Sequence, residues 1–408
     1  MKLPALNYKN HPFFNCGNPQ CPICAKAYSY LKIKNKLVKE NFSSDTVAPF
    51  VGRFNYPNIN IGILTPPQAT EEAWLYDAPK YWSFKNFEIP KIIDFRASLI
   101  NSRTNINVRA RNKFLELNQE IAMASKPANI EINLKEKPRF KLNLDGYVAP
   151  TGPRAILKKA TLTENPRISY KVEKAFSDTD LKANEALIYL YKKNFDENFL
   201  SRLLSVGSIG LKPNRKLVPT RWSITATDDI LGRNIINEIK NYKEINYKSY
   251  FGGYLGNFYL ILLFPEIWSY ELFETYAGSK QFCGACSYMT DYEPYEGRKY
   301  YASSTAGGYY SVRLAILEKL KQLKRQASVL ALRFITRDYT LPLGVWCTRE
   351  ATRKALQNKP IEFSDKVLMI KYAKKLIKKK FNFDLDNLLN KSILLRKINT
   401  QSKIAKFV

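Results

Sequence analysis

Histidine, cysteine and long apolar runs are all scarce in this chain of 408 residues. It has one histidine and six cysteines, which is too few cysteines for a small disulfide-stabilised domain. The longest strongly apolar run extends from Phe258 to Pro265, which is too short to span a membrane and predicts a buried strand. The first residues have no apolar stretch of the kind found in secretory signals. We therefore expect a cytoplasmic protein that is not associated with a membrane.

Acidic side chains are also scarce relative to basic ones. The chain has 65 Lys and Arg residues against 36 Asp and Glu residues, which gives a formal net charge of +29. A charge of this sign and size favours binding to polyanions, most simply to nucleic acid. The apolar content of 45% and the aromatic content of 13% are those of a folded globular protein. The sequence therefore predicts a folded protein with a nucleic acid partner.

The few metal-binding residues are concentrated near the start of the chain. His11, Cys16, Cys21 and Cys24 lie within one short segment that also contains several prolines. The spacing Cys21-x-x-Cys24 is typical of a zinc knuckle, in which two thiolates from one tight turn bind the same ion. Four protein ligands leave no open coordination position, so these four residues predict a structural zinc site.

Two other cysteine positions leave alternatives open. Cys283 and Cys286 form a second C-x-x-C pair. Three interpretations of this pair are open: it supplies zinc ligands in place of His11, it is a redox pair, or it is a buried turn. Cys347 is interpreted as a small core residue.

The order of strand-like and helix-like segments is irregular, which predicts an α+β fold (irregular mixed α/β) rather than a repeating βαβ arrangement. We expect a helix over 92–124, an irregular region over 125–160, and a long helix that is capped by Ser364 or Asp365 and runs to about Lys380.

The domain organisation predicted from these segments has four parts. They are a small zinc-knot module (1–30), an N-terminal α+β domain (31–290), a C-terminal α/β domain (291–385) and a flexible basic tail (386–408).

The most site-like polar cluster consists of Arg221, Asp228 and Asp229. Two adjacent carboxylates bind one Mg²⁺ only from a turn or a helix start, because they point apart in a strand. This cluster is the candidate catalytic site if the protein is an enzyme. The alternative is that the two aspartates are the N-cap of a helix over 230–240. The glycine pairs Gly252-Gly253 and Gly307-Gly308 fit neither a P-loop nor a dinucleotide fingerprint. They indicate close packing, or they let backbone N–H groups approach phosphates.

A second candidate surface is basic. Lys371, Lys374, Lys375 and Lys378 recur at helical spacing, opposite an apolar face. Such a helix docks on a core and presents lysines to DNA phosphates without sequence specificity, or it is an ordinary solvated face.

The last eight residues contain the pattern Gln401-x-x-Ile404-x-x-Phe407-Val408. Ile404 and Phe407 are three residues apart, so one helical turn places both side chains on one face. This spacing resembles the peptide box by which replication and repair proteins bind the sliding clamp (PCNA). These boxes usually end in two aromatic residues, whereas the second position here is Val408.

Several segments together resemble one family, the archaeal Nre DNA repair proteins. The matching segments include Cys16-Gly-Asn-Pro-Gln-Cys21-Pro and the ranges 50–60, 177–185, 219–229, 252–257, 306–313, 325–328 and 342–346. The resemblance implies a role in the response to DNA damage, an N-terminal zinc module and a C-terminal clamp-binding box. Family members carry an additional C-x-x-C pair upstream of Cys16 that is absent here, and we interpret His11 and Cys24 as its substitutes.

The sequence therefore predicts a nucleoid-associated repair factor that the sliding clamp recruits and that binds DNA non-specifically. An alternative function is that of a metal-dependent nuclease or another DNA-processing enzyme that uses Asp228 and Asp229. A third possibility is a basic protein associated with RNA or the ribosome.

Overall fold

The computed structural model describes residues 16–17, 21–36, 40–138, 151–277 and 288–400. These residues divide into two compact units, an N-terminal unit within Ala5–Leu231 and a C-terminal unit within Gly232–Val408. Each unit has one six-stranded sheet with helices packed on it, which confirms the mixed α+β fold. The division falls inside helix α8 (Thr220–Ile239), whereas the sequence suggested a boundary at 290/291. None of the described helices is long and apolar enough to cross a membrane.

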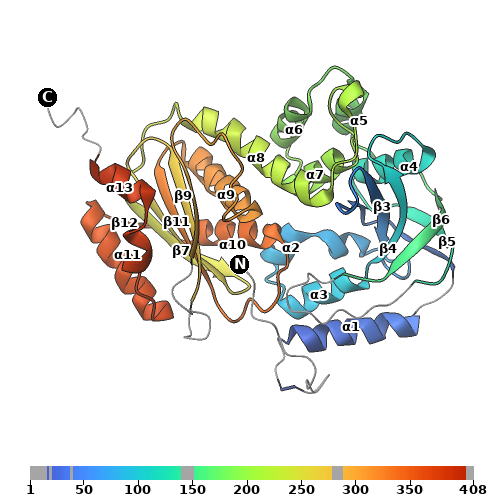
Figure 1. Cartoon of the computed structure of the whole chain (residues 1–408), viewed down its shortest axis with the longest axis horizontal. Coiled ribbons are helices and arrows are strands. Elements are labelled where there is room, and N and C mark those ends of the chain that lie inside the picture. The colour runs from blue at the N-terminus through green and yellow to red at the C-terminus, as the bar shows by residue number, and fades with distance from the viewer. Residues whose placement is uncertain (1–15, 18–20, 37–39, 139–150, 278–287, 401–408) are drawn as a thin grey trace. The chain divides into compact units, whose positions relative to one another are not determined.

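The N-terminal unit is built on a sheet with the strand order β1-β5-β6-β4-β3-β2 (Figure 1). Its strands are β1 (Asn41–Asp45), β2 (Ala48–Val51), β3 (Asn58–Thr65), β4 (Ile100–Asn107), β5 (Asn129–Leu134) and β6 (Arg154–Leu162). Neighbouring strands are antiparallel except β4 and β6, which are parallel. Along β3, every second residue from Ile59 to Ile63 is a buried isoleucine, while Asn58 is exposed and Asn60 and Leu64 are half-buried. One face of the sheet therefore forms the core of the unit.

Helices and short 3₁₀ turns surround this sheet. They are α1 (Pro22–Lys36), η1 (Ala73–Asp77), α2 (Pro79–Phe84), α3 (Ile89–Ser98), α4 (Lys113–Met123), α5 (Tyr170–Ser177), α6 (Ala183–Lys192), α7 (Glu197–Ser205) and η2 (Lys212–Asn214). Helix α4 covers the apolar face of the sheet, where Ile121 packs in one cluster with Ile63, Ile130 and Leu157.

The helix predicted over 92–124 was wrong in its middle. Strand β4 separates α3 from α4 and pairs with β3 along its whole length, from Ile100↔Thr65 to Asn107↔Asn58. Residues 100–107 form a strand because they pair with β3, a contact that the local sequence pattern does not reveal. The tendency of a segment to form a strand depends strongly on its neighbours in the fold. The irregular region predicted over 125–160 likewise contains β5 and the first part of β6.

The sheet of the C-terminal unit has the strand order β10-β9-β11-β8-β7-β12. Its strands are β7 (Lys248–Tyr254), β8 (Asn257–Phe264), β9 (Ser269–Tyr276), β10 (Tyr288–Glu293), β11 (Ser328–Ile335) and β12 (Ile361–Glu362). Strand β11 lies in the middle, antiparallel to β8 and parallel to β9, and all of its residues are buried. The buried strand predicted at Phe258 to Pro265 is confirmed as β8.

Helices cover both faces of this second sheet (Figure 1). On one face lie α9 (Gly307–Leu323) and α10 (Val345–Gln357), and on the other lie α11 (Lys366–Phe381), α12 (Asp386–Leu389) and α13 (Ile393–Thr400). The cap predicted for α11 is confirmed, because Asp365 Oδ1 accepts a hydrogen bond from Leu368 N at 2.9 Å. Residues 386–400 were expected in an extended tail and instead form α12 and α13, whose Leu388 and Leu394 are buried in the core.

Candidate metal centre and nucleic-acid interface

The three described cysteines of the N-terminal segment lie together. The Sγ atoms of Cys16, Cys21 and Cys24 are all within 4.8 Å of one another, and the Cys24–Cys16 Sγ–Sγ distance is 3.4 Å. Thiolates bound to one Zn²⁺ at about 2.3 Å in a tetrahedron lie roughly 3.8 Å apart. The cluster is therefore of the right size for one ion, and its soft donors fit zinc.

Helix α1 fixes two of these cysteines. Cys21 directly precedes the helix, and its carbonyl accepts from Ala25 N at 3.0 Å, while Cys24 lies in the first turn. Burial raises the pKa of the Cys21 thiol to about 11. The helix is itself anchored, because Ser29 Oγ donates to Asp94 Oδ1 on α3 at 3.0 Å. The thiols of Cys21 and Cys24 are thus held at a fixed place on the N-terminal unit.

A fourth ligand is needed to complete a tetrahedral site. The predicted ligand His11 and the alternates Cys283 and Cys286 lie outside the described residues. Bound zinc would crosslink the N-terminal segment to α1. An ion with four protein ligands has no open position for a substrate, so its role would be structural.

The carboxylates proposed as a catalytic pair are found in the middle of a helix. Asp228 is buried and Asp229 is half-buried, and both lie well inside α8. Adjacent side chains on an α-helix diverge by about 100°. Arg221, in the first turn, is exposed and two turns away from Asp228. A catalytic role for the three residues stays a prediction.

The alternative interpretation of these aspartates as an N-cap was wrong. Helix α8 begins at Thr220, eight residues before Asp228. Its buried side carries Ser223, Thr227 and Leu231 at intervals of four residues. Two of these three are small and polar, so the hydrophobic periodicity that signals a helix is missing from the sequence. Among the described residues, the three-cysteine cluster is the one group of metal-ligating side chains with the necessary proximity.

The predicted basic face of α11 exists, although its lysines are not equivalent. Lys371, Lys375 and Lys378 are exposed, whereas Lys374 Nζ forms an ion pair with Asp386 Oδ1 at 2.6 Å. The opposite side of the helix buries Met369, Ala373 and Ile377 in the core of the C-terminal unit. The helix is thus docked as the sequence predicted, and DNA binding by its lysines stays a prediction.

A groove of about 600 Å³ borders this helix. Its lining includes the basic residues Lys366, Lys371 and Arg396 together with apolar residues such as Ile370 and Leu395. Helix α13, on the far side of the groove, is fixed at its start by Glu271 of β9. The carboxylate of Glu271 accepts from Ile393 N and Leu394 N, both at 3.0 Å. Both helices that border the basic groove, α11 and α13, are therefore fixed on the core of the C-terminal unit.

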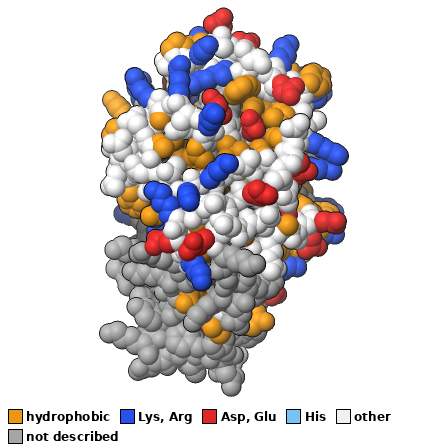
Figure 2. Space-filling view, turned by 90° about the vertical axis from the view of Figure 1, so that its right-hand side faces the viewer, with side chains coloured by type: hydrophobic (Ala, Val, Ile, Leu, Met, Phe, Trp, Pro, Cys, Tyr) orange, Lys and Arg blue, Asp and Glu red, His pale blue; other side chains and the backbone are white. Residues whose placement is uncertain are grey.

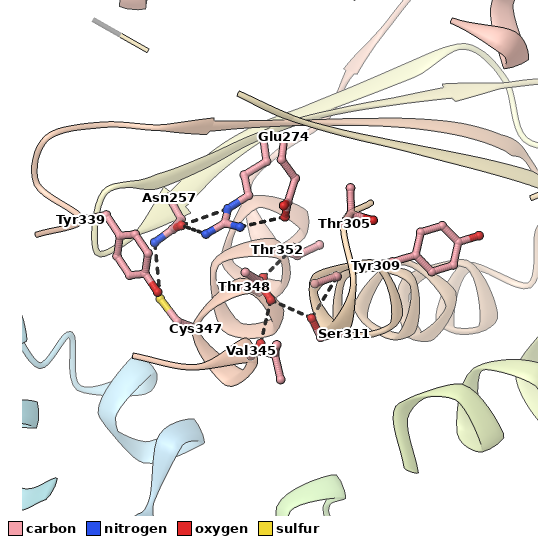
Figure 3. Close-up of polar contacts among 12 residues, drawn as sticks. Asn257, Glu274, Thr305, Tyr309, Ser311, Tyr339, Val345, Cys347, Thr348 and Thr352 are labelled. Atoms are coloured by element: carbon pink, nitrogen blue, oxygen red, sulfur yellow. Dashed lines mark hydrogen bonds and ion pairs between the residues drawn. The ribbon is translucent and has the colours of Figure 1, made fainter. Parts of the chain in front are cut away.

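A network of buried polar side chains fills the space between the second sheet and α9 and α10 (Figure 3). Arg333 Nη1 donates to Glu274 Oε1 at 2.7 Å, and Arg333 Nε donates to Asn257 Oδ1 at 3.0 Å. Asn257 Nδ2 donates to Cys347 Sγ at 3.4 Å. Ser311 Oγ and Thr348 Oγ1 lie 2.7 Å apart and join the two helices. These groups bind one another and are enclosed, so the network holds the fold together.

The same network explains Cys347 and the glycine pairs. Burial raises the pKa of the Cys347 thiol to about 12, which makes it an inert core residue, as predicted. A Cβ at Gly308 would lie 2.9 Å from Glu274 Oε1, and one at Gly252 would lie 2.9 Å from Ala355 Cα. These glycines permit close packing, so the phosphate-binding interpretation receives no support from the structure.

One surface feature was missed by sequence reasoning. Phe54, Tyr56 and Trp222 are large aromatic residues that are 72%, 46% and 47% exposed. The rings of Tyr56 and Trp222 are 5.7 Å apart between centroids, and Arg53 lies over the Phe54 ring at 5.1 Å. We call Phe54, Tyr56 and Trp222 the aromatic platform. The tilted contact between Tyr56 and Trp222 links segments that are far apart in the sequence, so no local pattern indicates it.

Basic charge elsewhere on the molecule is more dispersed. On the face seen in Figure 2, lysine and arginine side chains are spread among acidic ones and around apolar side chains. The lowered pKa of Arg103, caused by burial and by the neighbouring Arg154, marks one place where two arginines of the first sheet lie close together. The predicted clamp-binding residues Gln401, Ile404, Phe407 and Val408 lie outside the described residues.

Comparisons with known proteins cover nearly the whole chain. Two family models match it: archaeal Nre, N-terminal, over residues 15–282, and archaeal Nre, C-terminal, over residues 293–407. A protein of Archaeoglobus fulgidus named DNA repair protein NreB is 33% identical over 94% of this chain and 95% of its own length. DNA repair protein NreA of Haloferax volcanii is 37% identical over 76% of each chain, and NreA of A. fulgidus is 37% identical over 85% of this chain and 88% of its own. No solved structure matches.

Proposed function

Because the chain belongs to the archaeal Nre family, we propose that it is a DNA repair factor that the sliding clamp recruits to DNA. The observation that carries the proposal is the similarity to proteins named for DNA repair, which extends over as much as 94% of the chain. The large positive charge of +29 supports contact with DNA. The family resemblance extends the proposal to clamp recruitment.

In this proposal the C-terminal box provides the recruitment. Gln401, Ile404 and Phe407 have the spacing of a clamp-binding peptide, with Ile404 and Phe407 as the apolar anchors. The box directly follows α13, whose first turn is bonded to Glu271 and whose last residue, Thr400, is exposed. The box is thus joined to an element that is fixed on the C-terminal unit.

Binding to purified clamp, measured by isothermal titration calorimetry, tests the box. Ile404→Ala with Phe407→Ala should weaken binding by about 100-fold or more, because each buried apolar side chain contributes roughly 1.5–3 kcal/mol. The matched control, Ser402→Ala with Ala405→Ser, changes two residues of the same peptide that are not anchors and should bind like the parent chain. Equal binding by all three proteins would refute recruitment through the box.

The basic face of α11 is the proposed site of non-specific DNA binding. Lys371, Lys375 and Lys378 are exposed on it, and Lys366 and Arg396 border the adjoining groove. Replacing the three exposed lysines by alanine should lower the affinity for duplex DNA. It should also reduce the slope of log K against log salt by roughly 0.9 for each phosphate that the variant no longer neutralises.

A control variant that loses three lysines elsewhere shows whether DNA binding depends on the α11 face or only on the net charge of the protein. Lys126, Lys158 and Lys159 belong to the N-terminal unit, and Lys158 and Lys159 are exposed on β6. Their triple alanine variant should keep the salt slope close to that of the parent protein. An equal loss of affinity in both variants would show that charge alone, and not α11, determines binding.

The zinc knot completes the proposal as a structural element. Cys16, Cys21 and Cys24 supply three thiolates at suitable distances, and His11 is the proposed fourth ligand. A structural site of this kind stabilises the segment that carries it and leaves DNA chemistry to other groups.

A further inference from the structure

The aromatic platform has a geometry that core packing does not explain. Its three residues are between 46% and 72% exposed. Single exposed apolar residues are normal on protein surfaces, but a group of large aromatic side chains marks an interaction site. Tyr56 and Trp222 contact each other with ring planes tilted by 47°. This arrangement leaves ring surface on both residues open to a flat partner.

Backbone hydrogen bonds fix the platform in place. The loop between β2 and β3 carries Phe54 and Tyr56, and Val51 N, at its start, donates to Thr220 Oγ1 beside Trp222 at 2.9 Å. At the other end of this loop the Pro57 carbonyl accepts from Val108 N at 2.9 Å, and the Val108 carbonyl accepts from Leu217 N at 2.8 Å. Three segments of the N-terminal unit therefore hold the rings in a preformed arrangement.

The same three segments are basic and free of acidic residues. The ranges 52–58, 108–113 and 211–223 contain no Asp or Glu. Their exposed basic residues are Arg53, Arg109, Arg111, Lys113, Lys212, Lys216 and Arg221. A positive field of this kind attracts a polyanion to the site of the rings, since no carboxylate in these segments opposes it.

We propose that the aromatic platform binds the unpaired bases of single-stranded DNA, with Arg53 and Arg221 contacting the phosphates. This proposal rests on the DNA-binding function proposed above and specifies single-stranded DNA as the form of DNA that is bound. Every base has a flat π face, so stacking on Tyr56 and Trp222 tolerates any sequence. Bases in an intact duplex are already stacked and are not available to the rings. The platform therefore discriminates exposed single strands from duplex DNA.

A protein partner would use the same surface differently. Aromatic and arginine side chains are also frequent in the centres of protein interfaces. Those centres are depleted of charge, however, whereas the three segments that hold this platform carry seven exposed basic residues. The charge is complementary to a nucleic acid backbone, which is why the occupant is assigned as single-stranded DNA.

Fluorescence anisotropy with labelled oligo(dT) and with a blunt duplex of similar length tests this assignment in the full chain. Tyr56→Ala with Trp222→Ala should weaken oligo(dT) binding by about 30-fold, because stacking contributes roughly 1–3 kcal/mol per base. Duplex binding should change less than about twofold. Tyr56→Phe with Trp222→Phe keeps both rings and should restore most of the affinity.

Two further measurements make the test specific. Tyr170 and Trp74 are exposed aromatic residues elsewhere in the N-terminal unit, so Tyr170→Ala with Trp74→Ala is the matched control and should bind oligo(dT) normally. Stacking on Trp222 should also quench tryptophan fluorescence when oligo(dT) binds, and Trp222→Phe should remove that component. Circular dichroism melting should show the same Tm for all variants.

Several outcomes would overturn the assignment. Unchanged oligo(dT) binding in Tyr56→Ala with Trp222→Ala refutes the platform, and so does an equal loss of duplex binding. Tighter binding of oligo(rU) than of oligo(dT) refutes the assignment to DNA. If duplex binding through the α11 lysines persists in any of these cases, the proposed DNA-binding function stands and the platform alone fails. If the parent protein binds neither nucleic acid, the proposed function fails as well.

Discussion

The C-terminal unit encloses a network of buried polar side chains that bind one another, whereas the N-terminal unit holds a cysteine cluster and an exposed aromatic platform that suit outside partners. In the C-terminal unit Arg333 is bonded to Glu274 and Asn257 inside the fold. Burial by itself lowers the pKa of Arg333, and the neighbouring Tyr259 and Glu274 outweigh that effect, so that its pKa is raised overall. In the N-terminal unit Arg53 is exposed over an aromatic ring that is itself exposed.

The cysteines differ between the units in the same way. Cys347 accepts a hydrogen bond from Asn257 and is fully enclosed. Cys16, Cys21 and Cys24 bring three sulfur atoms within reach of a single ion, an arrangement that suits a cation. Buried groups that are satisfied internally specify a fold, whereas groups gathered in a fixed geometry of the right size are the ones that recognise a ligand. The cysteine cluster and the aromatic platform of the N-terminal unit are therefore candidate binding sites in addition to the basic face of α11.

Loss of one zinc ligand gives the largest expected effect, because the apparent free energy of binding structural zinc is on the order of 10 kcal/mol and depends on every ligand. Cys21→Ser should lower the zinc content from about one ion per chain to nearly none, measured by plasma mass spectrometry. Cys347→Ser removes a thiol from the enclosed network of the other unit and should keep the full zinc content. A parent protein purified without zinc, and unable to take it up, would contradict the metal site and this part of the contrast between the units.

The buried ion pair gives the next largest effect. Glu274→Gln leaves the Arg333 charge buried without its carboxylate and should destabilise the protein by about 3–5 kcal/mol in urea denaturation. Glu362 is exposed and forms an ion pair with Lys248 at 2.7 Å, so Glu362→Gln is the control and should change stability by less than about 1 kcal/mol. Equal effects of the two substitutions would mean that the enclosed network does not stabilise the C-terminal unit as we infer.

The sequence predicted those features whose partners lie close together along the chain. The cysteine cluster could be found from spacing because its three described members lie within nine residues. Strand β8 was recognisable as a continuous apolar run, and α11 from its cap and its lysine spacing. The start of α8 was missed because its buried side carries Ser223 and Thr227. The aromatic platform was missed because only the fold brings Tyr56 to Trp222.

Thiol reactivity gives a smaller effect that still separates the two units. The pKa of Cys347 is about 12 against an ordinary value of 9.0, so its thiolate fraction at pH 8 is lower by about a thousandfold. Since the thiolate is the reactive form, alkylation of Cys347 should be slow at pH 8 and should rise as the pH is raised. Mass spectrometry after treatment with iodoacetamide should show Cys16 and Cys24 modified long before Cys347 in chelated, folded protein. Rapid labelling of Cys347 at pH 8 would show that its pocket opens.

Helix caps give the smallest expected effect. Comparing one cap in each unit tests whether the two units also differ in the local stability of their helices. Asp196 Oδ1 accepts from Phe199 N at 2.8 Å at the start of α7, and Asp365 Oδ1 accepts from Leu368 N at 2.9 Å at the start of α11. Each cap satisfies one backbone donor by the same geometry, so Asp196→Ala and Asp365→Ala should each destabilise their unit by about 1 kcal/mol. Hydrogen exchange followed by mass spectrometry reports the two helices separately.

Asp196→Asn and Asp365→Asn keep the accepting oxygen and should have little effect. If the caps are equal, the two units share the same local helix energetics and differ only in how their tertiary polar groups are satisfied. A much larger effect at one cap would place part of the difference in the helices themselves.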